Sequence, residues 1–530
     1  MKNLLKKFFP LTEKTALFVF SSAFFLGSGA LWLIPFKFYQ YGGLTYFFLL
    51  FISLAFFTVP ALGAEMLAGR ASQTTLLDSF SALRRPKWTF LGYSMILALI
   101  LFAAFFSEYS VYATTSLEKS IYFSFSDNPN WSDTEPSYLK YVNLLIAISV
   151  SFALLSLKIY RNENSDIPPS RLGIPLKLKT FSNLFLIFTL IFILTLLVYL
   201  WANPVSFSRI VELFFSMGSR ANKEGILLEV LADSFFIFLA GRGVLFAFSG
   251  YFQKETGVTT FSIRLISIGI FIAFLFSFLL IGIIFINEEE GKEIILSPAL
   301  LFEKIPVTLL RLSAGKLVLF LFFAVLFVIF TVTLSGWMEI VGSSISLILQ
   351  TSRSLSLKIA GIIFFSVFMI SHYFHDHSFT IPSYTETTYK YISLASLAEN
   401  YDLKDWEQIK FAVSGTYFPE KYFTNEQVPE AERIFYSFKG NKETQTISVV
   451  IKKPSDCTGL NNFSFFMLKR YFIPVLVLLV SIFTGWILPE SVKRPEFAKG
   501  DSYFSKYYNI WNVLIKYFVP GAAIILLIYG

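Results

Sequence analysis

Arg242 is the residue of this sequence with the clearest chemical consequence, because it stands between Gly241 and Gly243 inside a long apolar stretch. An ionisable group at membrane depth costs about 2.5–3.5 kcal/mol on insertion scales, so a guanidinium there needs an anion. Asp233 lies about 13 Å away along an intact helix, too far to be an easy partner. The anion is therefore either Glu65, near the end of another apolar stretch, or the carboxylate of a bound substrate.

A second interruption occurs early in the chain, at Gly27, Ser28 and Gly29, with Pro35 following. Glycine and proline in the middle of an apolar segment predict that its helix breaks there. The backbone N–H groups of a broken helix end bind anions, helped by the helix dipole. A GxG break in the first helix of each half of a chain is typical of inverted-repeat transporters with a site near the midplane. We expect the first repeat at about 15–202 and the second to begin at about 227.

Further polar groups lie inside apolar stretches. Glu65 either lines a polar cavity or is solvated at the interface. Glu108 and Tyr109 are adjacent, hence about 100° apart on a helix, so only one of them can face a given cavity. Thr333 belongs to a small-polar patch ahead of Glu339, whose hydroxyls either serve a site or bond the carbonyls of the preceding turn. We expect structural or coupling roles for Glu65, Glu108, Asp233, Thr333 and Glu339.

The elements that must position these groups are apolar helices. Of the 530 residues, 55% are hydrophobic and 15% are charged, and the apolar residues lie in long blocks, which indicates an all-α polytopic membrane protein. Eleven stretches are long enough to span a bilayer: about 15–38, 43–68, 87–115, 140–159, 180–202, 227–252, 261–286, 316–350, 356–374, 464–488 and 509–529.

The distribution of charge predicts the orientation of these spans. With a cytoplasmic N-terminus, the inside loops carry most of the basic residues, and the outside loop 116–137 is mainly acidic. The first stretch is too long for a signal-peptide core, so we expect it to be retained. Eleven spans place the C-terminus outside the cytoplasm. The net charge of +8 then reflects topology, and we expect no nucleic-acid partner.

Residues 376–462 are polar and interrupt the pattern between 1–375, with spans one to nine, and 463–530, with spans ten and eleven. The segment 394–413 is predicted to be helical, and 432–453 to form a β-hairpin, so we expect a small extracytoplasmic α+β insertion that is able to contact a protein partner. His372, His375 and His377 lie together beside Asp376, a pattern that suits zinc or arises by chance at a polar helix end. We assign no metal site. The single cysteine excludes an internal disulfide.

Several motifs resemble the neurotransmitter:sodium symporter family, whose bacterial members include amino-acid transporters of the leucine-transporter fold. The resemblance is collinear over nearly the whole chain. Gly27, Gly29, Trp32 and Pro35 stand where the family has GLGNIWRFP, and the remaining matches are Gly42, Gly43, Glu65, Gly69, Arg70, Tyr109, Phe235, Phe236, Gly241, Gly243, Tyr251, Glu339, Gly485, Trp486 and Pro520. The resemblance implies a 5+5 inverted repeat. It implies that Tyr109 donates to a substrate carboxylate at the first break and that Phe236 is an aromatic lid.

The sequence departs from the family at its ion sites and its gate. Ala30 replaces an asparagine that ligates sodium, and Ile237 replaces a threonine of the same site. At the second sodium site one hydroxyl remains, on Thr333. The family's outer gate pairs an arginine with an aspartate, and these positions are Leu33 and Phe465, so we expect this gate to be absent. Sodium is a possible ion whose ligands are largely missing, and we expect no other cofactor.

These inferences predict a secondary active transporter of the bacterial cytoplasmic membrane that moves an amino acid or a related small carboxylate by alternating access. The expected substrate-binding residues are Gly27, Ser28, Gly29, Tyr109, Phe236, Gly241, Arg242 and Gly243. The alternative is a sensor or interaction platform that does not transport, suggested by the loss of ion ligands and gate. An enzyme is disfavoured, because no nucleophile, base and orienting group converge in the sequence.

Overall fold

The protein is described by a computed structural model over residues 18, 21–125, 137–155, 176–202, 204–215, 226–250, 256–287, 300–312, 314–375, 377–391, 423–424, 435–441, 446–501 and 503–529. The chain divides into two compact units. The first unit comprises 1–370 and 464–530, and the second comprises 371–463. Each unit is described by itself below.

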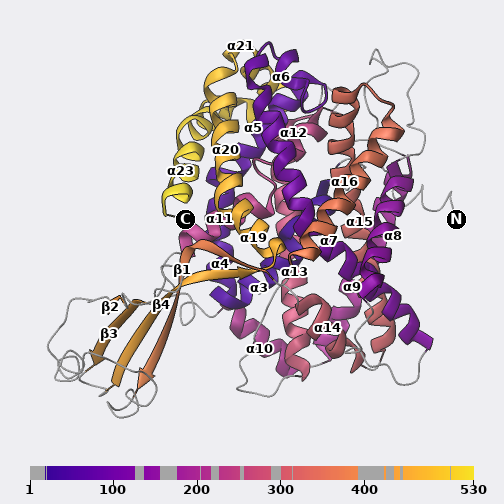
Figure 1. Cartoon of the computed structure of the whole chain (residues 1–530), viewed down its shortest axis with the longest axis vertical. Coiled ribbons are helices and arrows are strands. Elements are labelled where there is room, and N and C mark those ends of the chain that lie inside the picture. The colour runs from indigo at the N-terminus through magenta and orange to yellow at the C-terminus, as the bar shows by residue number, and fades with distance from the viewer. Residues whose placement is uncertain are drawn as a thin grey trace. The chain divides into compact units, whose positions relative to one another are not determined.

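The first half of the helical unit contains the segments predicted as spans one to five (Figure 1). Span one is interrupted by a π-helical turn, and span two contains another. The elements are η1 (Leu26–Ala30), α3 (Leu31–Tyr41), α4 (Gly43–Ser53), η2 (Leu54–Thr58), α5 (Val59–Ser72), α6 (Ser79–Ala82), η3 (Pro86–Trp88), α7 (Thr89–Phe125), α8 (Ser137–Leu155) and α9 (Leu176–Trp201). Gly42 joins α3 to α4 with φ 85° and ψ 131°, a conformation that excludes side chains.

The second half also contains a broken helix, α11 and α12, followed by longer helices. Its elements are α10 (Pro204–Phe215), α11 (Ile226–Ile237), α12 (Val244–Ser249), α13 (Val258–Asn287), α14 (Leu300–Leu310), α15 (Gly315–Leu349), α16 (Arg353–Tyr373), α19 (Leu460–Met467), η5 (Leu468–Phe472), α20 (Ile473–Ile482), η6 (Phe483–Ile487), α21 (Glu490–Ala498), η7 (Phe504–Tyr507), α22 (Tyr508–Val513), η8 (Leu514–Phe518) and α23 (Val519–Tyr529). Helix α15 is the most buried of the long helices, since 83% of its most apolar stretch is covered by the rest of the protein.

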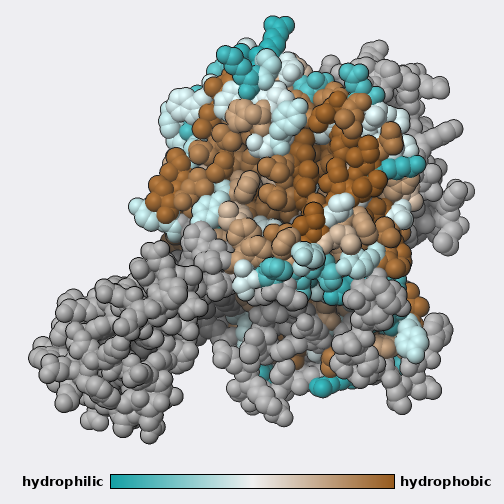
Figure 2. All heavy atoms as spheres, viewed as in Figure 1, coloured by the Kyte–Doolittle hydropathy of each residue, from teal (hydrophilic) through white to brown (hydrophobic). Residues whose placement is uncertain are grey.

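The helices have the length and surface of a multi-pass membrane protein. In the described part of the chain, seven helices are long and apolar enough to cross a membrane. The number is eight if α9 and α10, which meet at a bend of 105°, form one span. A shorter apolar helix covers Leu139–Ala153. Helices α3 and α11, which belong to the two broken spans, have 11 and 12 residues, so each is too short to cross a bilayer by itself. Figure 2 shows a broad band of hydrophobic side chains on one face, with hydrophilic ones gathered above it.

Two connecting segments differ from the sequence-based expectations. Helix α14, in the described part of 297–316, lies outside the eleven predicted spans and precedes α15. Helix α10 was not predicted. It follows α9 after a bend of 105° and is separated from it only by residues 202–203. Apolar composition alone does not distinguish a spanning helix from one that turns along its surface.

The second unit contains a four-stranded antiparallel sheet with strand order β1-β4-β3-β2. The strands are β1 (Ser378–Tyr391), β2 (Phe423–Thr424), β3 (Phe435–Asn441) and β4 (Thr446–Thr458). Strands β3 and β4 pair from Phe435 with Lys452 to Asn441 with Thr446, so the predicted hairpin is present. A register shift between Thr380 and Tyr384 marks an irregularity in the β1–β4 pairing. The predicted helix 394–413 lies outside the described residues.

Candidate functional site

The break in span one is narrower than the sequence suggested. Residues Leu26–Ala30 form a π-helical turn, in which the amide of Leu31 donates to the carbonyl of Leu26. Gly29 departs from helical geometry, with φ 171° and ψ −28°. The hydroxyl of Ser28 donates to the carbonyl of Phe24 at 2.8 Å. Span one therefore bends at one residue and continues into α3.

The break in span six is wider, because α11 ends at Ile237 and α12 begins at Val244. Helix α11 ends in a Schellman motif: the amide of Ala240 donates to Phe235 O at 3.1 Å, and that of Leu239 donates to Phe236 O at 3.4 Å. Leu239 occupies the left-handed position of the motif with φ 66°, where glycine is usual. A side chain there costs on the order of 1–2 kcal/mol, which is strain stored at the break.

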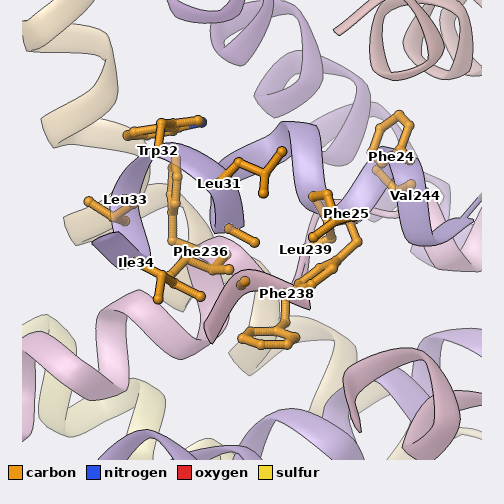
Figure 3. Close-up of a cluster of buried hydrophobic side chains, with 14 of the residues drawn as sticks. Phe24, Phe25, Leu31, Trp32, Leu33, Ile34, Phe236, Phe238, Leu239 and Val244 are labelled. Carbon is orange, nitrogen blue, oxygen red and sulfur yellow. The ribbon is translucent and has the colours of Figure 1, made fainter. Parts of the chain in front are cut away.

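The two breaks meet. A Cβ atom on Gly29 would lie 3.4 Å from the Cα of Ile237 and 3.6 Å from Cε1 of Phe236. The rings of Phe25 and Phe238 are 4.4 Å apart. Figure 3 shows the side chains of span one facing those of the span-six break. The predicted proximity of the two breaks is therefore present as contact between span one and the end of α11, where the span-six break begins.

Glu65 joins span two to the span-six break. Its carboxylate oxygen Oε1 accepts a hydrogen bond from the backbone N–H of Gly241, and its side chain is fully buried. This contact needs close packing of α5 against α12, where a Cβ on Gly69 would lie 2.0 Å from the carbonyl oxygen of Phe246. The alternative of a solvated interfacial Glu65 is wrong, and Glu65 braces the break.

Arg242 is 1% exposed and lies over two neighbouring aromatic rings, whose centroids are 5.5 Å apart. Its Cζ atom is 4.2 Å from the centroid of Phe102 and 4.3 Å from that of Phe236. Its Nη2 donates to the carbonyl of Phe236, whereas Nε and Nη1 have no hydrogen-bond partner among the described residues. In the same part of the chain, no ion pair within 4 Å joins Arg242 to Glu65. The guanidinium thus retains unused donors.

An aromatic cluster fills the space beside the breaks and consists of Trp32, Phe105, Tyr109, Phe236 and Phe465. The Trp32 ring stacks on Tyr109 at 5.1 Å and lies 5.7 Å from Phe465 and 6.2 Å from Phe236. Within the described part of the chain, the Tyr109 hydroxyl forms no hydrogen bond and is available to a ligand. The predicted residues Tyr109 and Phe236 are therefore brought together with span one.

Thr333 occupies the place where the resemblance implied a second sodium site. Its hydroxyl donates to Ile329 O at 2.9 Å and lies 3.5 Å from Phe24 O. A Cβ on Gly27 would lie 2.2 Å from this hydroxyl oxygen, so only glycine fits there. A Na⁺ ion needs several oxygens to replace its hydration shell. The Thr333 hydroxyl is instead bonded to backbone carbonyls, as predicted by the alternative in which these hydroxyls bond the carbonyls of the preceding turn.

Sequence reasoning missed an ionic group that we call the Lys469 cluster: Lys37, Tyr46, Glu229, Asp233 and Lys469. Lys469 Nζ lies 2.6 Å from Asp233 Oδ1 and 2.8 Å from Glu229 Oε1. Glu229 also pairs with Lys37 at 2.6 Å. The Tyr46 hydroxyl donates to Asp233 Oδ2 at 3.2 Å. The cluster connects α3, α4, α11 and η5 and balances two cations against two carboxylates.

Spans one and ten nevertheless share an ionic contact one helical turn from the two positions of the absent gate. Leu33 and Phe465 are apolar, but Lys37 and Lys469 each follow four residues later, which is one helical turn. Glu229 bridges the two lysines. The sequence contained a signal for this contact: each of the two apolar gate positions is followed by a lysine four residues later.

Glu108 and Glu339 have partners that favour structural roles. Glu108 accepts a hydrogen bond from the Tyr112 hydroxyl, one turn along α7, at 2.9 Å. Glu339 pairs with Arg353 at 2.6 Å, and Arg353 also donates to Leu155 O at 3.0 Å. These contacts fix α15 to the start of α16 and to the end of α8.

A second set of charged contacts lies at the end of α5, where Gly69 packs on α12. Arg70 Nε pairs with Glu496 Oε2 at 2.9 Å. Asp501 accepts from the amides of Thr259 and Thr260 at 2.9 and 3.1 Å and caps α13. Glu229 and Asp233 of the Lys469 cluster lie on α11, before the span-six break, whereas Gly69, next to Arg70, packs on α12, after the break. The two sets of contacts therefore lie on opposite sides of this break.

The histidine group does not form a metal site with described ligands. The rings of His372 and His375 are stacked with centroids 6.1 Å apart. Among the described residues no group of three or more His, Cys, Asp or Glu is placed to hold a metal ion. Asp376 lies outside those residues.

Comparison with known proteins gives a structural match and no match in sequence. No family model matches the chain, and no curated protein matches its sequence. The fold is similar to the crystal structure of MhsT in complex with L-phenylalanine, with a TM-score of 0.66 and 14% sequence identity over 96% of this chain and 97% of MhsT. MhsT is a bacterial transporter of the neurotransmitter:sodium symporter family. The chain therefore has the leucine-transporter fold with its 5+5 inverted repeat, as the sequence predicted.

Proposed function

We propose that the chain is a secondary active transporter that moves an amino acid or a related small carboxylate by alternating access around the breaks of spans one and six. The observation that carries the proposal is Arg242, a buried guanidinium with unused N–H donors at the contact between two broken helices. Broken helices paired in this way mark the substrate site of inverted-repeat transporters. The similarity to MhsT, a transporter bound to L-phenylalanine, supports the same function.

The substrate-binding residues in this proposal lie around the contact of the breaks. The backbone of Gly27, Ser28 and Gly29 and the hydroxyl of Tyr109 receive the substrate's carboxylate on one side. Phe236 covers it, and the segment Gly241, Arg242, Gly243 forms the other wall. Ser28 contributes its backbone only, since its hydroxyl is bonded to Phe24 O.

The proposed orientation places the N-terminus in the cytoplasm and the C-terminus outside it, in a bacterial cytoplasmic membrane. Span one then runs outward, so the Lys469 cluster closes the outer side of the site and Arg70 with Glu496 closes the inner side. In this proposal 1–375 and 463–530 form the transport unit, and 376–462 is an extracytoplasmic insertion able to contact a partner protein.

Uptake by this transporter is expected to be independent of sodium, because Ala30, Ile237 and the carbonyl-bonded Thr333 leave few ligands for the ion. The test is uptake of radiolabelled amino acids and dicarboxylates into proteoliposomes, with external NaCl or an equal concentration of KCl. Equal initial rates are expected, with protein-free liposomes as the control. A rate at least about tenfold higher in NaCl, equivalent to 1.4 kcal/mol, would contradict this expectation.

Asp233 and Glu108 are two of the carboxylates for which the sequence predicted a structural or coupling role, and a carboxylate is able to carry a coupling proton. Their contacts with Lys469 and Tyr112 favour a structural role for both. Glu65 is the carboxylate nearest the breaks, and its Oε2 has no hydrogen-bond partner among the described residues. If uptake responds to a pH gradient, Glu65 is the group to examine first.

The second candidate function is a sensor derived from a transporter. It is favoured by the close packing of the aromatic cluster, in which Trp32, Tyr109 and Phe465 occupy the space beside the breaks. Saturable ligand binding without flux in the same proteoliposomes would favour the sensor over the transporter.

A further inference from the structure

We propose that Arg242 and Trp337 together bind a second anionic group of the substrate, so that the preferred substrates are small acids with two carboxylates. This inference rests on the proposed function. It adds a residue, Trp337, that the sequence did not indicate, and it narrows the substrate class from carboxylates in general to dicarboxylates and acidic amino acids.

The first observation is the hydrogen-bonding state of Arg242. A guanidinium has five N–H donors, and unmade hydrogen bonds are costly for a buried group. The Arg242 Cζ lies 4.2 and 4.3 Å from the ring centroids of Phe102 and Phe236, and these centroids are 5.5 Å apart, so the two rings are neighbours and do not sandwich the guanidinium. Its Nη2 donates to Phe236 O. The donors on Nε and Nη1 have no partner among the described residues, and a planar acceptor such as a carboxylate matches their arrangement.

The second observation comes from a different helix. Trp337, on α15, is fully buried, and its indole Nε1 has no hydrogen-bond partner among the described residues. A buried indole N–H usually has an acceptor. The Trp337 ring packs edge-on against Phe102 at 4.6 Å, the ring that also covers Arg242. Two residues with unused donors, one neutral and one cationic, thus both contact the ring of Phe102.

The carboxylates of the described residues do not form an ion pair with Arg242, so its charge is able to bind an anion of the substrate. Glu65 interacts electrostatically with Arg242 but forms no ion pair with it within 4 Å among the described residues, and its Oε1 accepts from the N–H of Gly241. The Lys469 cluster is balanced within itself. Glu339 on α15 is paired with Arg353. A carboxylate is the acceptor that best suits the planar edge of a guanidinium, through charge-assisted and often bidentate hydrogen bonds.

The anion bound here is distinct from the one proposed at the first break. Phe236 separates the two positions: a Cβ on Gly29 would lie 3.6 Å from its ring edge, and the Arg242 guanidinium lies 4.3 Å above its face. A substrate with one carboxylate beside Gly29 and Tyr109 needs a second carboxylate to reach Arg242 and Trp337. A single carboxylate leaves one of the two donor sets unused.

The experiment measures binding to the purified full chain in detergent, by equilibrium dialysis, of L-glutamate, L-aspartate, succinate, L-leucine and L-phenylalanine. The dicarboxylates are expected to bind at least about tenfold more tightly than the two apolar amino acids. Arg242→Met should weaken dicarboxylate binding by about tenfold to a hundredfold, the usual range for a hydrogen bond to a charged group. Trp337→Phe should weaken it by about two- to tenfold.

Two control variants match these changes away from the site. Arg264→Met removes an exposed guanidinium from α13, and Trp486→Phe removes an exposed indole N–H. Both should leave the preference for dicarboxylates unchanged. Because Arg242→Met leaves the buried Glu65 carboxylate without its neighbouring cation, thermal unfolding is measured first to establish that the variant folds. If it does not fold, the selectivity of the native chain and the effect of Trp337→Phe still decide the question.

The outcomes separate this inference from the proposed function. If L-leucine or L-phenylalanine binds as tightly as L-glutamate, L-aspartate and succinate and Trp337→Phe has no effect, the second anion site is wrong and a transporter of apolar amino acids remains. If no compound binds and none is taken up by proteoliposomes, the proposed function fails and this inference fails with it.

Discussion

Replacing Lys469 with methionine is expected to destabilise the chain by about 3–5 kcal/mol, the usual cost of removing one partner of a buried ion pair. Asp233 is fully buried and has Lys469 Nζ at 2.6 Å as its cation. Without that cation, the Tyr46 hydroxyl is its main remaining contact. Glu229 is less affected, because it retains Lys37. The measurement is thermal unfolding of the purified chain in detergent.

A second substitution separates charge from packing. The double variant Lys469→Met/Asp233→Asn removes both charges and should recover much of the stability that Lys469→Met loses. Lys358→Met, at an exposed position of α16, is the matched control and should change stability by less than about 0.5 kcal/mol. If Lys469→Met behaves like this control, the Lys469 cluster does not hold spans one, six and ten together.

Replacing Glu65 with alanine is expected to have an effect of similar size, about 3–5 kcal/mol, for two combined reasons. The N–H of Gly241 loses its acceptor inside the break, and the buried guanidinium of Arg242 loses its nearest carboxylate. Glu65→Gln retains an oxygen acceptor for Gly241 and removes only the charge, so it should be less harmful. Thermal unfolding is again the measurement.

The charge contribution is tested by a double-mutant cycle. Arg242→Met should offset part of the loss caused by Glu65→Gln, because the two changes remove opposite buried charges. Additive effects of the two substitutions would mean that Glu65 supports the backbone of the break without balancing Arg242. Equal stability of Glu65→Ala and the native chain would exclude the bracing role altogether.

The fold was predictable because its signals are local. Long apolar runs predict spanning helices without knowledge of their partners. The glycines around Ser28 and Arg242 predicted the two breaks, which the structure places in contact. The extent of each break was not predictable. Span one bends at Gly29 alone, whereas span six opens over residues 238–243, since a π-helical turn keeps backbone hydrogen bonds that an unwound segment loses.

The ionic contacts of the site were not predictable from local pattern. Asp233 and Lys469 are far apart in the sequence, and their pairing depends on how α11 packs against η5. The position of Trp337 was not predictable either, because in the sequence it is one of many apolar residues of α15. Only the structure shows that its ring packs against Phe102. Glu65 was identified because a carboxylate in an apolar helix must have a partner, which is a local argument.

The most direct test of the proposed site is an experimental structure determined with saturating L-glutamate. The account predicts density for the ligand between Gly29 and Arg242, with one carboxylate within hydrogen-bonding distance of the Arg242 edge and the Trp337 indole. Trp32 and Tyr109 are expected to move apart to admit it. Ligand density elsewhere on the chain, with the aromatic cluster still closed over Gly29, would contradict the account.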